Sequence, residues 1–166
     1  MKKRIFALAL AMALALTVPA VAAQDSADNF VRSRTYTGQF PDLTADSTFY
    51  DNVTALYEYG LTAGRADGTF GLRDSLTVGQ VVIFAGRIRS LYRTGDAEAG
   101  PEAHRGEAGE ATALRYLRYL QAEGVIGTEF DQLLYTAATR AQMAHVLANT
   151  LPEEALPPVH ADQVTQ

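Results

Sequence analysis

Apolar residues recur with helical spacing near the middle of the chain, and the signals that end a helix stand beside them. Between residues 48 and 59 one face is formed by Phe49, Val53, Leu56 and Tyr57, at i, i+4, i+7 and i+8. Gly60 follows, where a residue in the left-handed conformation ends a helix at little cost. The pattern predicts a short helix that buries one face.

A second helix is predicted to begin at Thr77, because Gln80 three residues later completes a capping box. Its buried face is expected to contain Val78, Val81, Val82, Ala85, Ile88 and Tyr92. Between the two helices, Asp67-Gly68 indicates a turn, since glycine tolerates positive φ and aspartate bonds the nearby backbone. The stretch therefore predicts a helix–loop–helix unit.

The same unit recurs between residues 110 and 151. A shift of 64 positions carries the first helix onto Ala113, Leu117, Leu120 and Gly124, and a shift of 62 carries the second onto Thr139, Gln142, Met143 and Leu147. Helices this short must bury their apolar faces against neighbours. We expect a mainly all-α fold in which two repeats, 40–93 and a degenerate 110–151, pack side by side.

Several residues of the first repeat occur together at a characteristic spacing: Phe40-x-Asp42-Leu43, Phe49-Tyr50, Gly60-Leu61, Gly64, Asp67-Gly68-Thr69-Phe70 and Thr77. In this the stretch resembles an S-layer homology (SLH) repeat, the module that holds proteins on bacterial cell envelopes. The family's second helix usually opens with Thr-Arg-Ala-Glu. Here the first repeat reads Thr77-Val78-Gly79-Gln80, without the arginine, and the second reads Thr139-Arg140-Ala141-Gln142 but lacks the Asp-Gly-Thr-Phe loop.

The resemblance implies a non-catalytic role: attachment to the cell envelope by binding an acidic secondary cell-wall polysaccharide, often one that carries pyruvate ketals. The alternative is a secreted protein-interaction or oligomerisation module on an SLH scaffold that has lost glycan binding. SLH modules generally come in threes around a pseudo-threefold axis, so the third repeat of the usual pseudo-trimer is missing. Self-association, another SLH protein or the tail would then cover the apolar faces of the two repeats.

Arg140 matches the family's ligand-contacting arginine. At the first position of a helix, free N–H groups and the helix dipole favour anions, and a guanidinium can grip a carboxylate with two hydrogen bonds. The alternative is a solvated or internally paired arginine. The other candidate ligand-binding residues are Thr139, Gln142, Asp67, Gly68, Thr69 and Tyr50. For the Asp67–Thr69 loop the alternative is turn chemistry alone, and for the tyrosines it is packing between repeats.

The flanking segments have compositions of their own. Residues 1–23 read as a secretory signal peptide, with Lys2, Lys3 and Arg4 before an apolar core and Val21-Ala22-Ala23 before the cleavage position. Residues 24–39 read as a linker, 94–109 as a mobile Gly/Ala/Glu-rich linker and 152–166 as a proline-rich tail. We therefore expect a secreted protein of the bacterial cell wall or cell surface.

Composition excludes several classes of function. Signal removal would take away three basic and no acidic residues, which changes the formal charge from −5 to −8 and disfavours nucleic-acid binding. With no cysteine, disulfides, thiol catalysis and thiolate metal sites are excluded. No nucleotide-binding, hydrolase or metal-ligand motif occurs, and no further apolar run could span a membrane. We expect no enzymatic activity, no cofactor and no metal.

Overall fold

The computed structural model describes residues 24–106 and 108–156, and within them it is helical, with no strand. The helices are α2 (Tyr50–Glu58), α3 (Val78–Thr94), α4 (Ala99–Ala103), α5 (Thr112–Ala122) and α6 (Arg140–Ala148). Three single 3-10 turns accompany them: η1 (Ala27–Asn29), η2 (Thr128–Phe130) and η3 (Glu153–Ala155). The predicted all-α class is confirmed.

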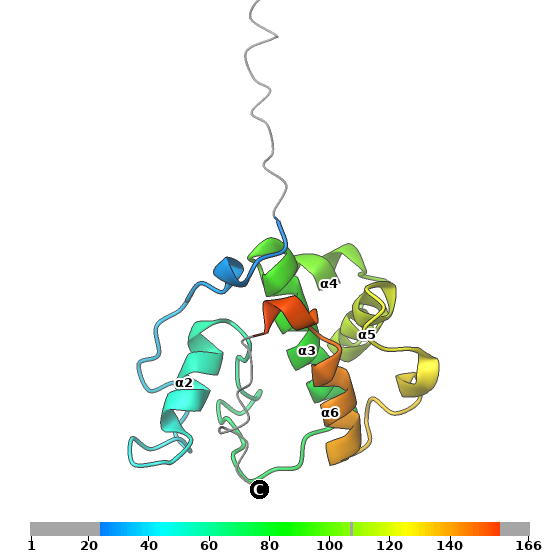
Figure 1. Ribbon diagram of the computed structural model, residues 1–166. Helices are drawn as coiled ribbons and strands as arrows, with labels where there is room; N and C mark the ends of the chain where they lie inside the picture. The colour runs from blue at the N-terminus through cyan, green and yellow to red at the C-terminus, as the bar shows by residue number, and fades with distance from the viewer. Residues whose placement is uncertain (1–23, 107, 157–166) are drawn as a thin grey trace, which may run out of the picture.

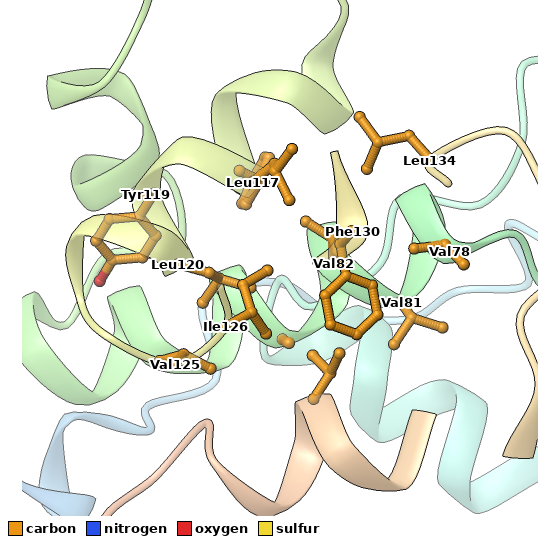
Figure 2. Close-up of a cluster of buried hydrophobic side chains, with 13 residues drawn as sticks. Val78, Val81, Val82, Leu117, Tyr119, Leu120, Val125, Ile126, Phe130 and Leu134 are labelled. Carbon is orange, nitrogen blue, oxygen red and sulfur yellow. The ribbon is translucent and has the colours of Figure 1, made fainter. Parts of the chain in front are cut away.

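Helix α3 is the central element, with α2 on one side and α5 and α6 on the other (Figure 1). Its face of Val78, Val81, Val82 and Ala85 is buried against α5, α6 and the segment that joins them. The partners from that half include Tyr116, Leu117, Leu120, Ile126, Phe130 and Val146, as Figure 2 shows for most of them. The main core thus joins the second helix of the first repeat to both helices of the second repeat.

A smaller aromatic cluster lies around α2. It consists of Phe40, Leu43 and Val53, with Tyr36, Tyr50, Tyr57, Phe70 and Leu72 packed against them. The rings of Phe40 and Tyr57 meet edge to face, with centroids 5.6 Å apart and planes at 89°. Edge-to-face contact brings the positive edge of one ring onto the negative face of the other, which adds to the burial of apolar area. This cluster is separate from the main core.

The starts of α3 and α6 are paired with each other. Thr77 and Ala137 form an isolated antiparallel bridge, in which the Val78 N–H donates to the Thr136 carbonyl at 2.9 Å and the Ala138 N–H donates to the Leu76 carbonyl at 2.8 Å. Both predicted capping boxes are present, at Thr77 with Gln80 and at Thr139 with Gln142. The equivalent helix starts of the two repeats therefore lie side by side.

Three expectations about burial and order were wrong. Phe49 is 55% exposed, because it is the N-cap residue of α2 and precedes the turn in which the apolar face forms. Leu147 is 38% exposed, because only Val146 of α6 turns fully into the core. The segment expected to be mobile, 94–109, contains α4, which packs against α3 and α5 and lies close to the ring of Tyr119 at Gly100.

The segment before Phe40 connects the two halves of the molecule. The Ser26 N–H and the Asn29 side chain both donate to the carbonyl of Tyr92 at the end of α3, and the Ser33 N–H donates to the Glu58 carbonyl at the end of α2. Arg32 adds an ion pair with Glu58.

The predicted signal peptide, residues 1–23, lies outside the described residues, as does the last part of the predicted tail. Among the helices in 24–106 and 108–156, none is long and apolar enough to cross a membrane.

Candidate ligand-binding surfaces

Asp42 fixes the loop of the first repeat against its opening residues. Its carboxylate accepts the N–H groups of Phe70 and Gly71, each at 2.8 Å. The Phe70 N–H lowers the pKa of Asp42 below its ordinary value, burial opposes it as the next largest effect, and the Gly71 N–H adds a smaller lowering. The family resemblance identified Asp42 in the sequence, but the sequence did not predict that its carboxylate holds this loop.

A polar pocket of about 450 Å³ lies beside this anchor, and Asp46, Ser47, Thr69 and Arg73 contribute to its walls. Of the three predicted loop residues, Asp67, Gly68 and Thr69, only Thr69 lines it. Asp67 accepts both the N–H and the hydroxyl of Thr69, at 2.9 and 2.7 Å, and the Thr69 hydroxyl is the first cause that lowers the Asp67 pKa. The polar atoms of this loop are largely used within its own turn.

Arg140 stands at the first position of α6, and its side chain is exposed. No ion pair or side-chain hydrogen bond joins it to another residue in the described part of the chain. Its neighbours Thr139 and Gln142 are committed to the capping box, where the Gln142 N–H donates to the Thr139 hydroxyl at 3.2 Å and the Thr139 N–H donates to the Gln142 amide oxygen at 2.9 Å. Arg140 is therefore the predicted residue best placed to receive an anion from solution.

Tyr50 belongs to the aromatic cluster around α2. Its ring meets Tyr36 edge to face, with centroids 5.9 Å apart, and its side chain is half-buried. The described structure thus places the predicted ligand-binding residues in three regions, at the α6 start, in the Asp67–Thr69 loop and in the aromatic cluster. It does not gather them around either of the two described pockets.

An apolar groove of about 470 Å³ lies between α2 and its loop on one side and α3 and α6 on the other. From α3 it receives Gln80, Ile83, Phe84 and Arg87, at i, i+3, i+4 and i+7, which is a second face of the helix whose first face fills the core. Leu56, Leu61 and Phe70 form the opposite wall, and Leu76, Met143 and Leu147 complete it. The sequence did not predict this groove, because periodicity identified only one apolar face of α3.

Arg87 is the residue at the groove that sequence reasoning missed. Its guanidinium donates to the Leu61 carbonyl at 3.2 Å, to Glu98 at 2.9 Å and to the Tyr116 hydroxyl at 3.2 Å, so it ties the α2 half to α3, α4 and α5. Its place among apolar residues in the middle of α3 is the only signal in the sequence. A charged side chain in such a helix needs partners when it is largely buried.

The structure also explains why the first repeat lacks the arginine of the family motif. Val78, which stands at that position, is 1% exposed and lies in the main core. Gly79, the next residue, donates its N–H to the Leu134 carbonyl at 2.8 Å, and a Cβ at Gly79 would lie 2.8 Å from that same oxygen. The start of α3 is thus built for packing, whereas the start of α6 faces solvent.

Comparison with known families adds one finding. A family model described as S-layer homology domain matches residues 39–71, which comprise α2, the Asp42 anchor and the Asp67–Thr69 loop. The match supports the resemblance of this segment to an S-layer homology domain. SLH domains are generally non-catalytic modules that attach proteins to the bacterial cell wall or cell surface. The match does not extend to the second repeat, whose SLH character stays a prediction. No curated protein and no solved structure matches the chain.

Proposed function

We propose that this protein is held at the bacterial cell surface by non-catalytic binding of an acidic secondary cell-wall polysaccharide, with pyruvate ketals or similar carboxylates as the groups recognised. The SLH match at residues 39–71 is the observation that carries the proposal, since such domains are envelope-anchoring modules. Arg140 is the proposed primary contact, because it is an exposed cation at a helix start with no partner in the described part of the chain.

The chemistry of the α6 start suits a carboxylate. The helix dipole and the first-turn N–H groups favour negative charge there, and the guanidinium fork matches both oxygens of a carboxylate. Thr139 and Gln142 hold the helix start in shape through the capping box, so they position Arg140 while leaving its side chain free to move toward a ligand. Thr69, on the wall of the polar pocket, is the proposed contact of the first repeat.

Binding to purified cell-wall sacculi tests this proposal, when sacculi that retain the secondary polymer are compared with sacculi from which it has been removed. Arg140→Ala should weaken binding by roughly 1.5–3 kcal/mol through loss of a charge-assisted hydrogen bond. Arg140→Lys should recover only part of the affinity, because an ammonium keeps the charge but lacks the planar fork.

Arg105→Ala is the matched control, since Arg105 is another exposed arginine but is paired with Glu102 and lies just after α4. It should bind sacculi like the wild type. If Arg140→Ala stays folded by circular dichroism and binds as well as Arg105→Ala, the glycan contact is assigned to the wrong residue. Wild-type binding that survives removal of the polymer would reject the polysaccharide itself.

Secretion is part of the same proposal. Residues 1–23 have the three regions of a signal peptide, so exported protein should begin within a few residues of Gln24. Mass spectrometry of the protein recovered from the envelope measures this end directly. An intact Met1 on exported protein would refute cleavage.

A second function is favoured by the apolar groove. A polysaccharide presents mostly hydroxyl groups, whereas the groove walls carry leucine, isoleucine, phenylalanine and methionine side chains. Such a surface is typical of protein-interaction sites. The protein-interaction alternative is therefore kept, with this groove as its surface.

A further inference from the structure

The groove between α2 and the α3–α6 pair presents apolar side chains to solvent. Leu76 is 47% exposed and Leu147 is 38% exposed, and both line it. Phe84 lies on its α3 wall and is only half-buried. Exposed apolar residues that converge on one concavity, instead of being scattered singly, indicate a surface that binds a partner.

The charged groups that line the groove are both paired. The charged residues among its described lining are Arg65 and Arg87, and no acidic residue lines it. Arg65 is paired with Asp74 and Arg87 with Glu98, so both cations are already balanced. Arg140 is not part of the groove's lining, but it precedes Met143 and Leu147 by three and seven residues, so helical periodicity places it on the same face of α6, one turn beyond them. An occupant that suits the groove is apolar and carries a carboxylate for Arg140.

The chain itself exposes such a group at the start of α2. Phe49 is 55% exposed and its N–H is held by the Ser47 hydroxyl at 3.3 Å, so the corner that carries the ring is ordered. Asp46 and Asp51 flank it and are both exposed. The Thr44 hydroxyl lowers the pKa of Asp46 below its ordinary value. A large aromatic side chain between acidic neighbours is the complement of an apolar groove that has Arg140 one helical turn beyond its lining.

We propose that a second copy of this chain docks at the groove, with Phe49 of each copy placed between Leu76, Phe84 and Leu147 of the other and its flanking carboxylates toward Arg140. Aromatic side chains that fill a desolvated pocket dominate the binding energy of many interfaces. If each copy gives one ring and receives one, the contact closes as a twofold dimer. The inference does not depend on the polysaccharide proposal.

Sedimentation velocity of the exported protein, across a concentration series, tests the docking. The wild type should form a dimer, whereas Phe49→Ser and Leu147→Arg should each raise the dissociation constant at least about tenfold. Both positions are exposed, so the variants should melt like the wild type. An equimolar mixture of the two variants should recover a dimer, because one intact ring then meets one intact groove.

Leu156→Ser is the matched control. Leu156 is 48% exposed and follows Glu153 and Glu154, so it resembles Phe49 in exposure and in acidic neighbours. It should leave the dimer unchanged. A wild type that is monomeric throughout the series overturns the proposal, as does loss of the dimer in Leu156→Ser but not in Phe49→Ser. A mixture that stays monomeric also overturns it, since the ring and the groove would then not be complementary.

Binding of the same variants to sacculi separates this inference from the proposed function. Neither Phe49 nor Leu147 belongs to the proposed glycan contacts, so dimer-deficient protein should still bind sacculi through Arg140 at high protein concentration. Arg140→Ala can lose polymer binding and still form the Phe49-dependent dimer. That result would keep the dimer and would reject only the contact between the flanking carboxylates and Arg140.

Discussion

Replacing Gly79 by alanine should destabilise the protein, although helix propensity alone predicts the opposite. Gly79 occupies the second position of α3, where the segment before α6 passes closest. An added Cβ would lie 2.8 Å from the Leu134 carbonyl oxygen and 3.1 Å from the Cβ of Ala113. Real Cβ atoms essentially never approach a backbone oxygen that closely. The Leu134 segment, α5 or both would have to move.

The magnitude follows from three effects. Alanine in place of glycine favours a helix by up to about 1 kcal/mol. Overpacking a close contact costs about 1–3 kcal/mol. The hydrogen bond from the Gly79 N–H to the Leu134 carbonyl, at 2.8 Å, contributes about 0.5–1.5 kcal/mol and would be weakened by the same movement. Together they give a net loss of about 0.5–3.5 kcal/mol, or a decrease in Tm of about 1–14 °C for a chain of this size.

Thermal and urea unfolding followed by circular dichroism would measure this change. Ala141→Gly is the control, because Ala141 holds the equivalent position in α6 and is exposed, so it should lose only the propensity difference of up to about 1 kcal/mol. A Gly79→Ala variant that is more stable than the wild type would refute the close approach of the two repeats at their helix starts.

Two further predictions concern pH. The pKa of Asp42 is lowered from 3.8, chiefly by the Phe70 N–H. The stability that Asp42 contributes is therefore present above pH 3.8 and is lost as pH falls through its lower pKa in the folded state. Thermal melts of Asp42→Asn at acid pH should lack this loss of stability. Burial raises the pKa of Tyr119 from 10.0 to about 12, so stability should fall as pH rises from 10 through 12, and tyrosinate absorbance of Tyr119→Phe should lack the component that titrates near pH 12.

Local signals in the sequence predicted the helix ends well. Thr77 and Thr139 each combine an N-cap hydroxyl with a glutamine three residues later, and both capping boxes form. Gly60 and Gly124 were predicted to follow the first helix of each repeat, and both have positive φ, at 72° and 70°. These features depend on a few neighbouring residues, so the sequence around them is sufficient to determine them.

The arrangement of the helices could not be predicted in the same way. Periodicity showed that α3 has an apolar face, but not that its partners would be Tyr116, Leu120 and Val146 of the second repeat. Nor did it show the opposite face, because Gln80 and Arg87 interrupt the apolar stripe there. The role of Arg87 as a link between elements could not be predicted, because its partners are far apart in sequence. They are the Leu61 carbonyl, Glu98 and Tyr116.

The candidate site shows the same division. The capping motif identified Arg140, and the structure leaves its side chain exposed, as an anion contact requires. Helical periodicity also predicted that Val78 would be buried at the equivalent position of α3, and it is 1% exposed. The pairing of the two helix starts could not be predicted, because the residues that form it are far apart in sequence.

The position of α3 has a consequence for how genes could recombine such repeats. A crossover between residues 94 and 109 would respect the sequence repeat but would separate α3 from the α5 and α6 side chains that enclose it. A crossover between residues 73 and 76 would leave that three-helix core intact and would exchange the α2 cluster with its loop. The unit that can be inherited as a whole is therefore offset by one helix from the unit that repeats in the sequence.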